Sequence, residues 1–215
     1  MSYQRLTMKK FLEELKNLRI DLNKINVIVD IGAEDGSDSI ELSKKIPGAF
    51  CYAVEGLKEN YDKYLKRLEN KNIKSFNAVI LDYDGKIGFH EKNDSGVHGV
   101  FRSHWSNTIK IHETDCYRFD TFISKYNLPI PDLVKLDVEG ASYEVIKGFG
   151  EVLDKVKIIQ IETETKYLFL GQRLQNEVFE ILNKNHFKEF YNMNCCDGQY
   201  DSIFVNEKYI NWLTS

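Results

Sequence analysis

The first third of the chain alternates between helical and strand-like hydrophobic patterns. Apolar residues recur at helical spacing between residues 7 and 22, with lysines and glutamates on the other side, and Thr7 is a candidate N-cap. Residues 26–31 (NVIVDI) are apolar on both faces, which is typical of a strand inside a parallel sheet. The elements expected next are helix 37–45, strand 49–55, helix 58–68 and strand 73–80. This order is that of a βαβαβ unit.

The second half of the chain repeats the alternation and then changes. The elements expected there are strand 132–137, helix 142–153, strand 157–162, helix 172–185, and strands 187–192 and 202–206 around the turn-rich residues 195–201. The pattern predicts a doubly wound α/β fold with a mostly parallel, seven-stranded, Rossmann-like sheet and a C-terminal antiparallel hairpin. Dehydrogenase folds usually continue as βα units to the end. A sheet that finishes in a hairpin is the architecture of many class I methyltransferases.

No linker, repeat or low-complexity segment divides the chain, so residues 1–215 are expected to form one domain that begins with a helix in residues 1–22. Residues 82–117 fit neither hydrophobic period and contain four of the five histidines. A long irregular segment in a compact domain is usually functional or disordered, and the aromatic residues here argue against disorder. We therefore expect a partly stranded insert on the substrate side, over the carboxyl ends of the strands.

Composition and charge narrow the classes of partner. The chain is 42% hydrophobic and 29% charged, within the globular range, and its net charge is −4 at pH 7. No broad basic field is available for nucleic acid, so a small or neutral partner is expected. The N-terminal residues form no unbroken apolar run, so neither a signal peptide nor a membrane span is expected, and the predicted location is cytoplasmic. The four cysteines lack zinc or redox spacing, and nothing in the pattern indicates an oligomeric state.

The turn after the first strand, residues 30–36 (DIGAEDG), has the composition of a ligand-binding loop. Gly32 and Gly36 allow a sharp turn and a close approach of the backbone to a ligand, and the next helix offers unpaired N–H donors. Glu34 and Asp35 disfavour a pyrophosphate and suit a ligand with an ammonium or sulfonium group. The alternative is a tight βα turn that binds nothing.

Polar side chains also follow the second and third strands. Glu55 lies 19 residues after Gly36, close to the roughly 20-residue spacing of an acid that binds ribose hydroxyls. Asn77 and Asp82 bracket the end of the third strand, where the edge of an adenine would lie. Each has a simpler interpretation, because Glu55 could cap the next helix and the other two could be ordinary turn residues.

The fourth strand is followed by two carboxylates, Asp137 and Glu139, at the crevice beyond the carboxyl ends of the strands. Reactants would meet there, so these residues are the first candidates for a general base. Alternatively, Asp137 only ends the strand and Glu139 caps the following helix. The D-x-E spacing could also hold a hard divalent cation, but only two carboxylates are local and no metal is predicted.

The insert supplies a second set of candidates. His98 and His104 are alternative bases, although a single histidine is more often a surface or packing residue. Phe101 and Trp105 could stack on the apolar face of a sugar ring, with Arg102 donating hydrogen bonds to its hydroxyls. These aromatic residues could instead anchor the insert on the sheet.

Several of these segments together resemble a known family. The motifs DIGAEDG, AVEG, NAVILD, CYRFDTF and, above all, DLVKLDVEGASYEVIKG are similar to those of FkbM-type methyltransferases, which use S-adenosylmethionine (SAM) to methylate oxygen. The resemblance extends from about residue 26 to residue 163, and its most specific part is residues 136–148. Two positions depart from the family pattern: Glu34 stands where asparagine is common, and Gly56 where a proline often follows the acid.

The resemblance implies SAM as cofactor, S-adenosylhomocysteine as product, and roles for five residues. Asp30, Gly32 and Gly36 would shape the cofactor turn, Ser39 would line it, and Glu55 would hold the ribose. The full expected cofactor-binding set is Asp30, Gly32, Ala33, Glu34, Gly36, Ser39, Glu55, Asn77, Asp82 and Asp137.

The leading expectation is a SAM-dependent O-methyltransferase that acts on a hydroxyl of a carbohydrate or glycan, such as a terminal sugar. The resemblance also implies macrolide-like secondary metabolites as alternative acceptors, and is compatible with a domain of a larger glycan-assembly protein. A non-catalytic domain that binds adenosyl ligands is a further alternative, because a fold can lose its chemistry. A nicotinamide-dependent oxidoreductase should show G-x-G-x-x-G, which is missing from the first turn. No D/N-P-P-Y motif follows the fourth strand, which argues against methylation of an adenine amino group.

Overall fold

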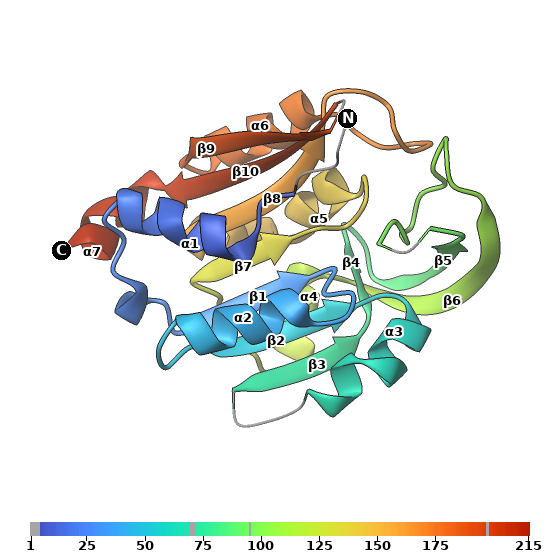
Figure 1. Cartoon of the computed structure of the whole chain (residues 1–215), viewed down its shortest axis with the longest axis horizontal. Coiled ribbons are helices and arrows are strands. Elements are labelled where there is room, and N and C mark those ends of the chain that lie inside the picture. The colour runs from blue at the N-terminus through green and yellow to red at the C-terminus, as the bar shows by residue number, and fades with distance from the viewer. Residues whose placement is uncertain (1–4, 69–71, 95, 197) are drawn as a thin grey trace.

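The main sheet of the computed structural model has seven strands, and the structure describes residues 5–68, 72–94, 96–196 and 198–215. The spatial order is β3 (Ile73–Asn77), β2 (Phe50–Glu55), β1 (Val27–Ile31), β7 (Leu133–Leu136), β8 (Ile158–Glu164), β10 (Gln199–Asn206) and β9 (Phe187–Cys196) (Figure 1). The first five strands in this order, from β3 through β2, β1 and β7 to β8, are parallel. Strand β10 runs antiparallel to both of its neighbours, β8 and β9. The predicted doubly wound sheet with a C-terminal antiparallel hairpin is confirmed.

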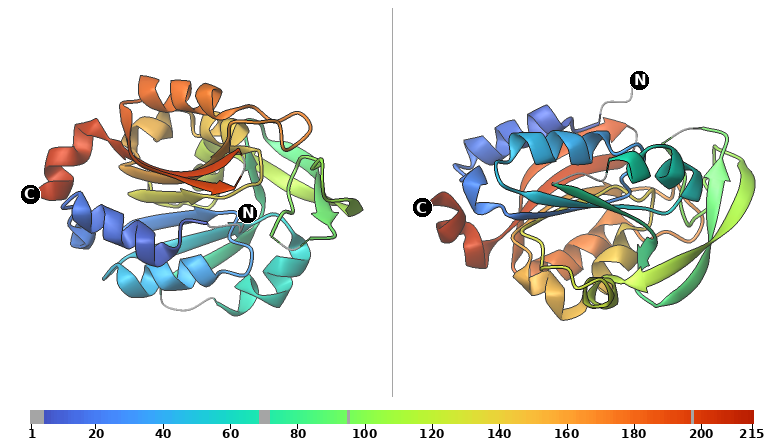
Figure 2. Two further views of the ribbon diagram at one scale, coloured as in Figure 1. Left: turned by 45° about the horizontal axis from the view of Figure 1, so that its top comes forward. Right: turned by 90° about the horizontal axis from the view of Figure 1, so that it is seen from below.

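Helices cover both faces of this sheet, as the views in Figure 2 show. One face carries α1 (Met8–Asn17), α2 (Ser37–Lys45) and α3 (Lys58–Lys63), and the other carries α4 (Phe119–Lys125), α5 (Ser142–Gly148) and α6 (Gln175–Lys184). Shorter elements are the 3-10 turns Leu22–Lys24, Leu65–Arg67, Gly150–Lys155 and Glu207–Tyr209, and the terminal α7 (Ile210–Thr214). Each face buries its own apolar cluster, and Phe119 stacks on Phe149 with ring centroids 4.0 Å apart.

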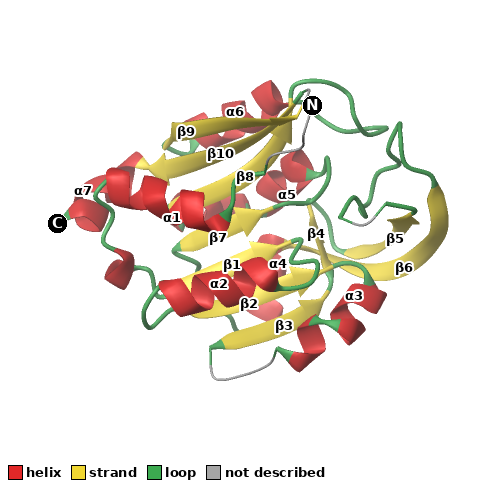
Figure 3. Cartoon of the chain, in the orientation of Figure 1, coloured by secondary structure: helices red, strands yellow, loops and turns green. Residues whose placement is uncertain are grey.

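A second, smaller sheet accounts for the irregular middle of the chain. It contains β4 (Val79–Leu81), β6 (Thr108–Arg118) and β5 (Gly85–Lys92), in the order β4-β6-β5. Figure 3 shows the long β5–β6 hairpin projecting beyond the main sheet. Much of the expected insert 82–117 is therefore a hairpin, and its residue 95 lies outside the described residues.

The expected strand boundaries differ from the structure at two places. The strand expected at 73–80 breaks after Asn77. The backbone N–H of Ala78 still donates to the carbonyl of Glu55 (3.1 Å), and the chain then turns into the second sheet. The strands of the C-terminal hairpin are longer than expected, so the turn expected at 195–201 is much shorter. Residue 197 of that turn lies outside the described residues.

The helices also depart from the sequence pattern. The N-terminal helix ends at Asn17 instead of residue 22, because the chain turns at Arg19, which has a left-handed φ of 59°. Its expected residues 1–4 lie outside the described range. The helix expected at 142–153 changes to 3-10 geometry at Gly150, and α4 and α7 are additional helices. Within the described ranges, no helix combines the length and the apolar character needed to cross a bilayer.

Candidate functional site

A cavity of about 440 Å³ lies where strands β1, β2 and β7 end, a volume suited to a small organic ligand. Residues after these strands line one side, the apolar residues 78–81 line a second, and the β5–β6 insert closes a third. The expected site residues that border the cavity are Gly32, Glu34, Glu55, His98, Trp105, Asp137 and Glu139. Those outside its lining are Asp30, Ala33, Gly36, Ser39, Asn77, Asp82, Phe101, Arg102 and His104.

The glycine turn after β1 packs directly against the end of β7. Gly32 has a φ of 83°, and a Cβ atom placed on it would lie 1.7 Å from the carbonyl oxygen of Asp137. The N–H groups of Gly32 and Ala33 both donate to the carbonyl of Val54, at 3.0 and 3.1 Å. Only glycine fits between these backbones, so the turn brings the ends of β1, β2 and β7 to one point.

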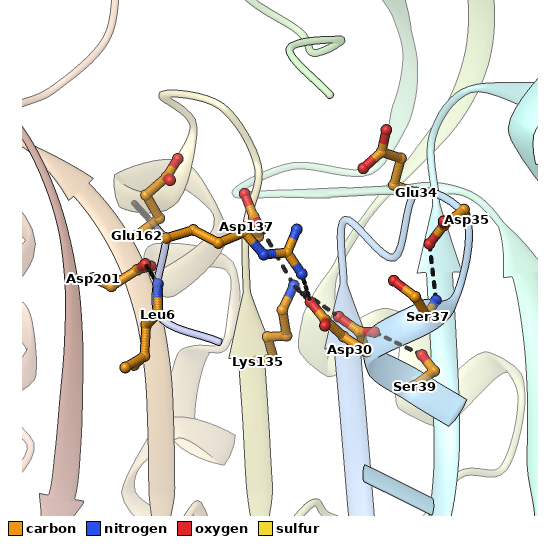
Figure 4. A network of polar contacts seen from close by, with 12 residues as sticks. Leu6, Asp30, Glu34, Asp35, Ser37, Ser39, Lys135, Asp137, Glu162 and Asp201 are labelled. Carbon is orange, nitrogen blue, oxygen red and sulfur yellow. Dashed lines mark hydrogen bonds and ion pairs between the residues drawn. The ribbon is translucent and has the colours of Figure 1, made fainter. Parts of the chain in front are cut away.

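A buried lysine holds the acids beneath this turn. Lys135 Nζ lies 3.3–3.4 Å from carboxylate oxygens of Asp30, Asp38 and Asp137, an arrangement visible in Figure 4. Burial disfavours its charge, but the three carboxylates outweigh burial and raise the pKa of Lys135. Asp30 also accepts a 2.6 Å hydrogen bond from Ser39 Oγ. Asp30 and Ser39 therefore support the turn from below.

Glu55 lies under the same turn and borders the cavity. One of its carboxylate oxygens accepts from the backbone N–H of Glu34 (2.9 Å) and the other from that of Leu57 (2.7 Å). Burial nevertheless raises the pKa of Glu55 to about 7. Each carboxylate oxygen has a second lone pair, so the side chain retains acceptor capacity for a ligand hydroxyl.

The two residues expected near an adenine edge have other partners. The Asn77 amide donates to the carbonyls of Glu55 (2.8 Å) and Gly56 (3.1 Å), which fixes the turn after β2. Asp82 forms an ion pair with Lys147 at 2.8 Å. The cavity wall beside them is formed by the apolar residues 78–81.

Three carboxylates meet at the inner end of the cavity. Asp137 and Glu139 are joined there by Glu162 of β8, and oxygen atoms of all three lie within 4.8 Å of one another. Glu139 is 7% exposed and has a left-handed φ of 52°, which is strained for a residue other than glycine. Burial and then the neighbouring Asp137 raise its pKa well above the ordinary value of 4.5.

Glu162 was absent from the sequence-based candidates, although a signal was present: it is a single acid in the apolar run IIQIE. Pairing of Leu136 with Ile161 places the following residues, Asp137 and Glu162, side by side. Gln199 Nε2 donates to Glu162 Oε1 at 2.6 Å.

The insert brings one of the two candidate histidines to the cavity. His98 borders it and accepts from the backbone N–H of Lys92 through Nδ1 (3.1 Å), and burial lowers the pKa of His98. His104 is exposed, and its backbone N–H donates to the carbonyl of Leu168. Lys92, which the sequence pattern did not single out, is 2% exposed, and burial lowers its pKa to about 8.

Of the three residues expected to bind a substrate, one borders the cavity. Trp105 is 50% exposed, and its ring centroid lies 5.1 Å from that of Phe169. Phe101 packs beside an apolar cluster of the insert. Arg102 is exposed, and its carbonyl accepts from the N–H of Leu170 (2.8 Å).

Comparison with known proteins decides the family. Residues 30–189 match the methyltransferase FkbM domain, which is most of the chain. The chain belongs to this family. Membership confirms the predicted enzyme class and cofactor, a SAM-dependent methyltransferase.

The relatives of this FkbM domain include the 2-O-methyltransferase NoeI of Sinorhizobium fredii, which is 29% identical over 177 residues, covering 73% of this chain and 70% of the relative. Among solved structures, a precorrin-6Y C5,15-methyltransferase from Geobacter metallireducens matches with a TM-score of 0.52 and 16% identity, over 95% of this chain and 93% of that one. Magnesium protoporphyrin IX methyltransferase from Synechocystis, with SAM bound, gives a TM-score of 0.52 and 13% identity over 91% and 76%. These structures confirm the class I methyltransferase fold.

Proposed function

We propose that this domain transfers a methyl group from SAM to a hydroxyl of a carbohydrate, such as a terminal sugar of a glycan. The observation that carries the proposal is that one cavity joins the glycine turn and Glu55 to the carboxylates of Asp137 and Glu139 and to the half-exposed Trp105. Similarity to a protein named as a 2-O-methyltransferase supports oxygen as the atom methylated.

In this proposal, the strand ends bind the cofactor. Glu55 accepts hydrogen bonds from the ribose hydroxyls, while the apolar residues 78–81 pack against the adenine. The methionine part of SAM would lie beside Gly32 and Glu34, which both border the cavity. The carboxylate of Asp137, which borders the cavity, favours the sulfonium.

The reaction needs a hydroxyl oxygen in line with the bond between the methyl carbon and sulfur. The oxygen attacks the carbon, the C–O bond forms, and the C–S bond breaks with its electron pair passing to sulfur, which leaves S-adenosylhomocysteine. The hydroxyl proton passes to a carboxylate. Glu139, whose pKa burial raises, is in its ionised form a stronger base than an exposed carboxylate, and Asp137 lies beside it. His98 is the second candidate base, since it also borders the cavity.

Calorimetric titration with SAM, S-adenosylhomocysteine and NAD tests the cofactor, and transfer of radiolabelled methyl from SAM to carbohydrates tests the acceptor. We expect adenosyl ligands but not NAD to bind. Glu139→Gln should abolish methyl transfer and leave the SAM affinity within a few-fold. Methylation of a macrolide-like alcohol but of no carbohydrate would contradict the acceptor class, and unchanged turnover in the variant would remove Glu139 from the mechanism.

Trp105 offers a test of carbohydrate stacking with a matched control. Trp105→Ala should raise KM for the acceptor about tenfold, since stacking on an aromatic face contributes about 0.5–1.5 kcal/mol beyond area burial. Trp212 in α7 is also partly exposed, at 43%, but lies outside the cavity lining. Trp212→Ala should leave KM unchanged. An equal effect of the two substitutions would contradict stacking at Trp105.

A further inference from the structure

The carboxylates at the inner end of the cavity come from three different positions along the chain. Asp137 follows β7, Glu139 lies in the turn before α5, and Glu162 belongs to β8. Their oxygen atoms nevertheless approach within 4.8 Å of one another. Like charges at this separation repel one another unless a proton or a cation is shared among them.

Glu139 provides a second, independent observation. It is more than nine-tenths buried, and its Oε2 atom has no hydrogen-bond partner among the described residues. A buried carboxylate oxygen without a donor is costly, and native structures usually satisfy such atoms. A cation that contacts all three carboxylates would supply the missing partner.

The nearby ammonium groups form their closest described contacts elsewhere, although the charge of Lys92 partly offsets the rise in the pKa of Glu139. Lys135 lies 3.4 Å from Asp137 but is shared with Asp30 and Asp38. Lys92 Nζ donates to the carbonyl of Val97 at 2.5 Å and lies 4.8 Å from the centroid of the Phe169 ring. Neither lysine supplies a described hydrogen bond to Oε2 of Glu139.

We propose that Asp137, Glu139 and Glu162 bind one divalent cation that prefers oxygen ligands, such as Mg²⁺ or Mn²⁺. Oxygen ligands of Mg²⁺ lie about 3.0 Å apart when adjacent and about 4.2 Å apart when opposite, given metal–oxygen distances of about 2.1 Å. A group within 4.8 Å can therefore close on one ion through small side-chain shifts. Asp137 and Glu139 border the cavity, so further coordination positions face the ligand space.

The consequence for catalysis rests on the proposed function. An acceptor hydroxyl that binds the cation becomes more acidic and, with Glu139 acting as a ligand, passes its proton to His98, the second candidate base. The cation would also orient the hydroxyl oxygen toward the methyl group. Asp137 and Glu139, which are two positions apart in the sequence, would then act as ligands, and Glu162 of β8 would complete the set.

Mn²⁺ binding provides the direct test. The full chain, stripped with a chelator, is titrated with Mn²⁺ while electron paramagnetic resonance reports the free aqueous ion. We expect one bound ion per chain, with Kd raised at least tenfold by Glu139→Gln and by Glu162→Gln. Glu91→Gln is the control, because Glu91 belongs to a separate group of possible ligands with Glu59 and His112, and it should leave this binding unchanged.

Absence of Mn²⁺ binding to the wild-type chain at millimolar concentration would overturn the inference. Binding that is lost in Glu91→Gln but retained in Glu139→Gln would also overturn it. Should a glutamine variant fail to fold, Glu162→Asp keeps the charge and is expected to weaken binding by shortening the ligand. Retention of wild-type affinity in that variant would count against the site.

The cation site and the proposed function fail in different ways. If Mn²⁺ binds as expected but no carbohydrate is methylated, the acceptor class is wrong and the cation site stands. If methyl transfer proceeds at the same rate with EDTA as with Mg²⁺ and Mn²⁺ does not bind, the cation site is wrong and the methyltransferase function stands.

Discussion

Replacement of Gly32 by alanine tests whether the contact between the glycine turn and β7 shapes the site. Alanine at a left-handed φ costs about 1–2 kcal/mol in strain. The added Cβ would also lie 1.7 Å from the carbonyl oxygen of Asp137, so the two strand ends must separate. Overpacking of this kind typically costs about 1–3 kcal/mol. The separation also endangers the 3.0 Å hydrogen bond from Asp137 N–H to the carbonyl of Ile31. The expected loss of unfolding free energy is therefore about 2–5 kcal/mol.

Gly48 provides the matched control for this substitution. Its φ is 78°, close to the 83° of Gly32, but a Cβ placed on it would meet no atom within 4 Å. Gly48→Ala should therefore cost only the strain of about 1–2 kcal/mol. Urea unfolding monitored by fluorescence measures both free energies, and calorimetry with SAM measures the effect on the site. The reasoning is refuted if both variants lose the same stability, or if Gly32→Ala binds SAM as tightly as Gly48→Ala.

Two further predictions concern buried charge. Glu55 has a folded-state pKa of about 7, above its ordinary 4.5, so the ligand-free protein loses stability as pH rises from 4.5 to 7. If SAM binds the ionised carboxylate, its affinity should fall by up to about tenfold per pH unit below 7. Calorimetry between pH 6 and 8 measures this slope, and the profile should be flat for Glu55→Gln. Lys135→Met leaves Asp30 buried without its cation and should lower the free energy of unfolding in urea by about 3–5 kcal/mol. Lys155→Met, at an exposed position, should lower it little. Similar losses in the two variants would contradict the buried network.

The sequence predicted the fold well where the residue pattern along a segment agrees with the place of that segment in the sheet. Residues 26–31 carry a pattern typical of a central parallel strand, and β1 occupies residues 27–31. Gly32 of the first turn was equally informative, because its positive φ is needed where the backbone passes the end of β7. Local pattern failed at residues 73–80 (IKSFNAVI), where strand-forming residues continue past Asn77 although the chain changes sheets there.

The candidate site was predicted in part for the same reason. Glu55 is the last residue of β2 and Asp137 directly follows β7, so the topology of a doubly wound sheet alone brings them to one crevice. Glu162 could not be placed there from spacing, because its proximity to Asp137 depends on the register between β7 and β8. Lys92 is buried by the fold of the insert, and no periodic pattern in residues 82–117 reveals that fold.

The buried charges divide into two groups with different consequences. Below the glycine turn, Lys135 lies between the carboxylates of Asp30 and Asp38, and Arg5 pairs with Asp38 at 2.5 Å, so both carboxylates have cationic partners within the chain. At the inner end of the cavity, Glu139 keeps a buried oxygen without a hydrogen-bond donor among the described residues, in a strained backbone conformation. A core that only had to be stable would replace such a group with an apolar side chain. Retaining Glu139 lowers the stability of the fold but provides a place where a proton, a cation or a positively charged ligand binds favourably. A methyl-transfer site requires such a place.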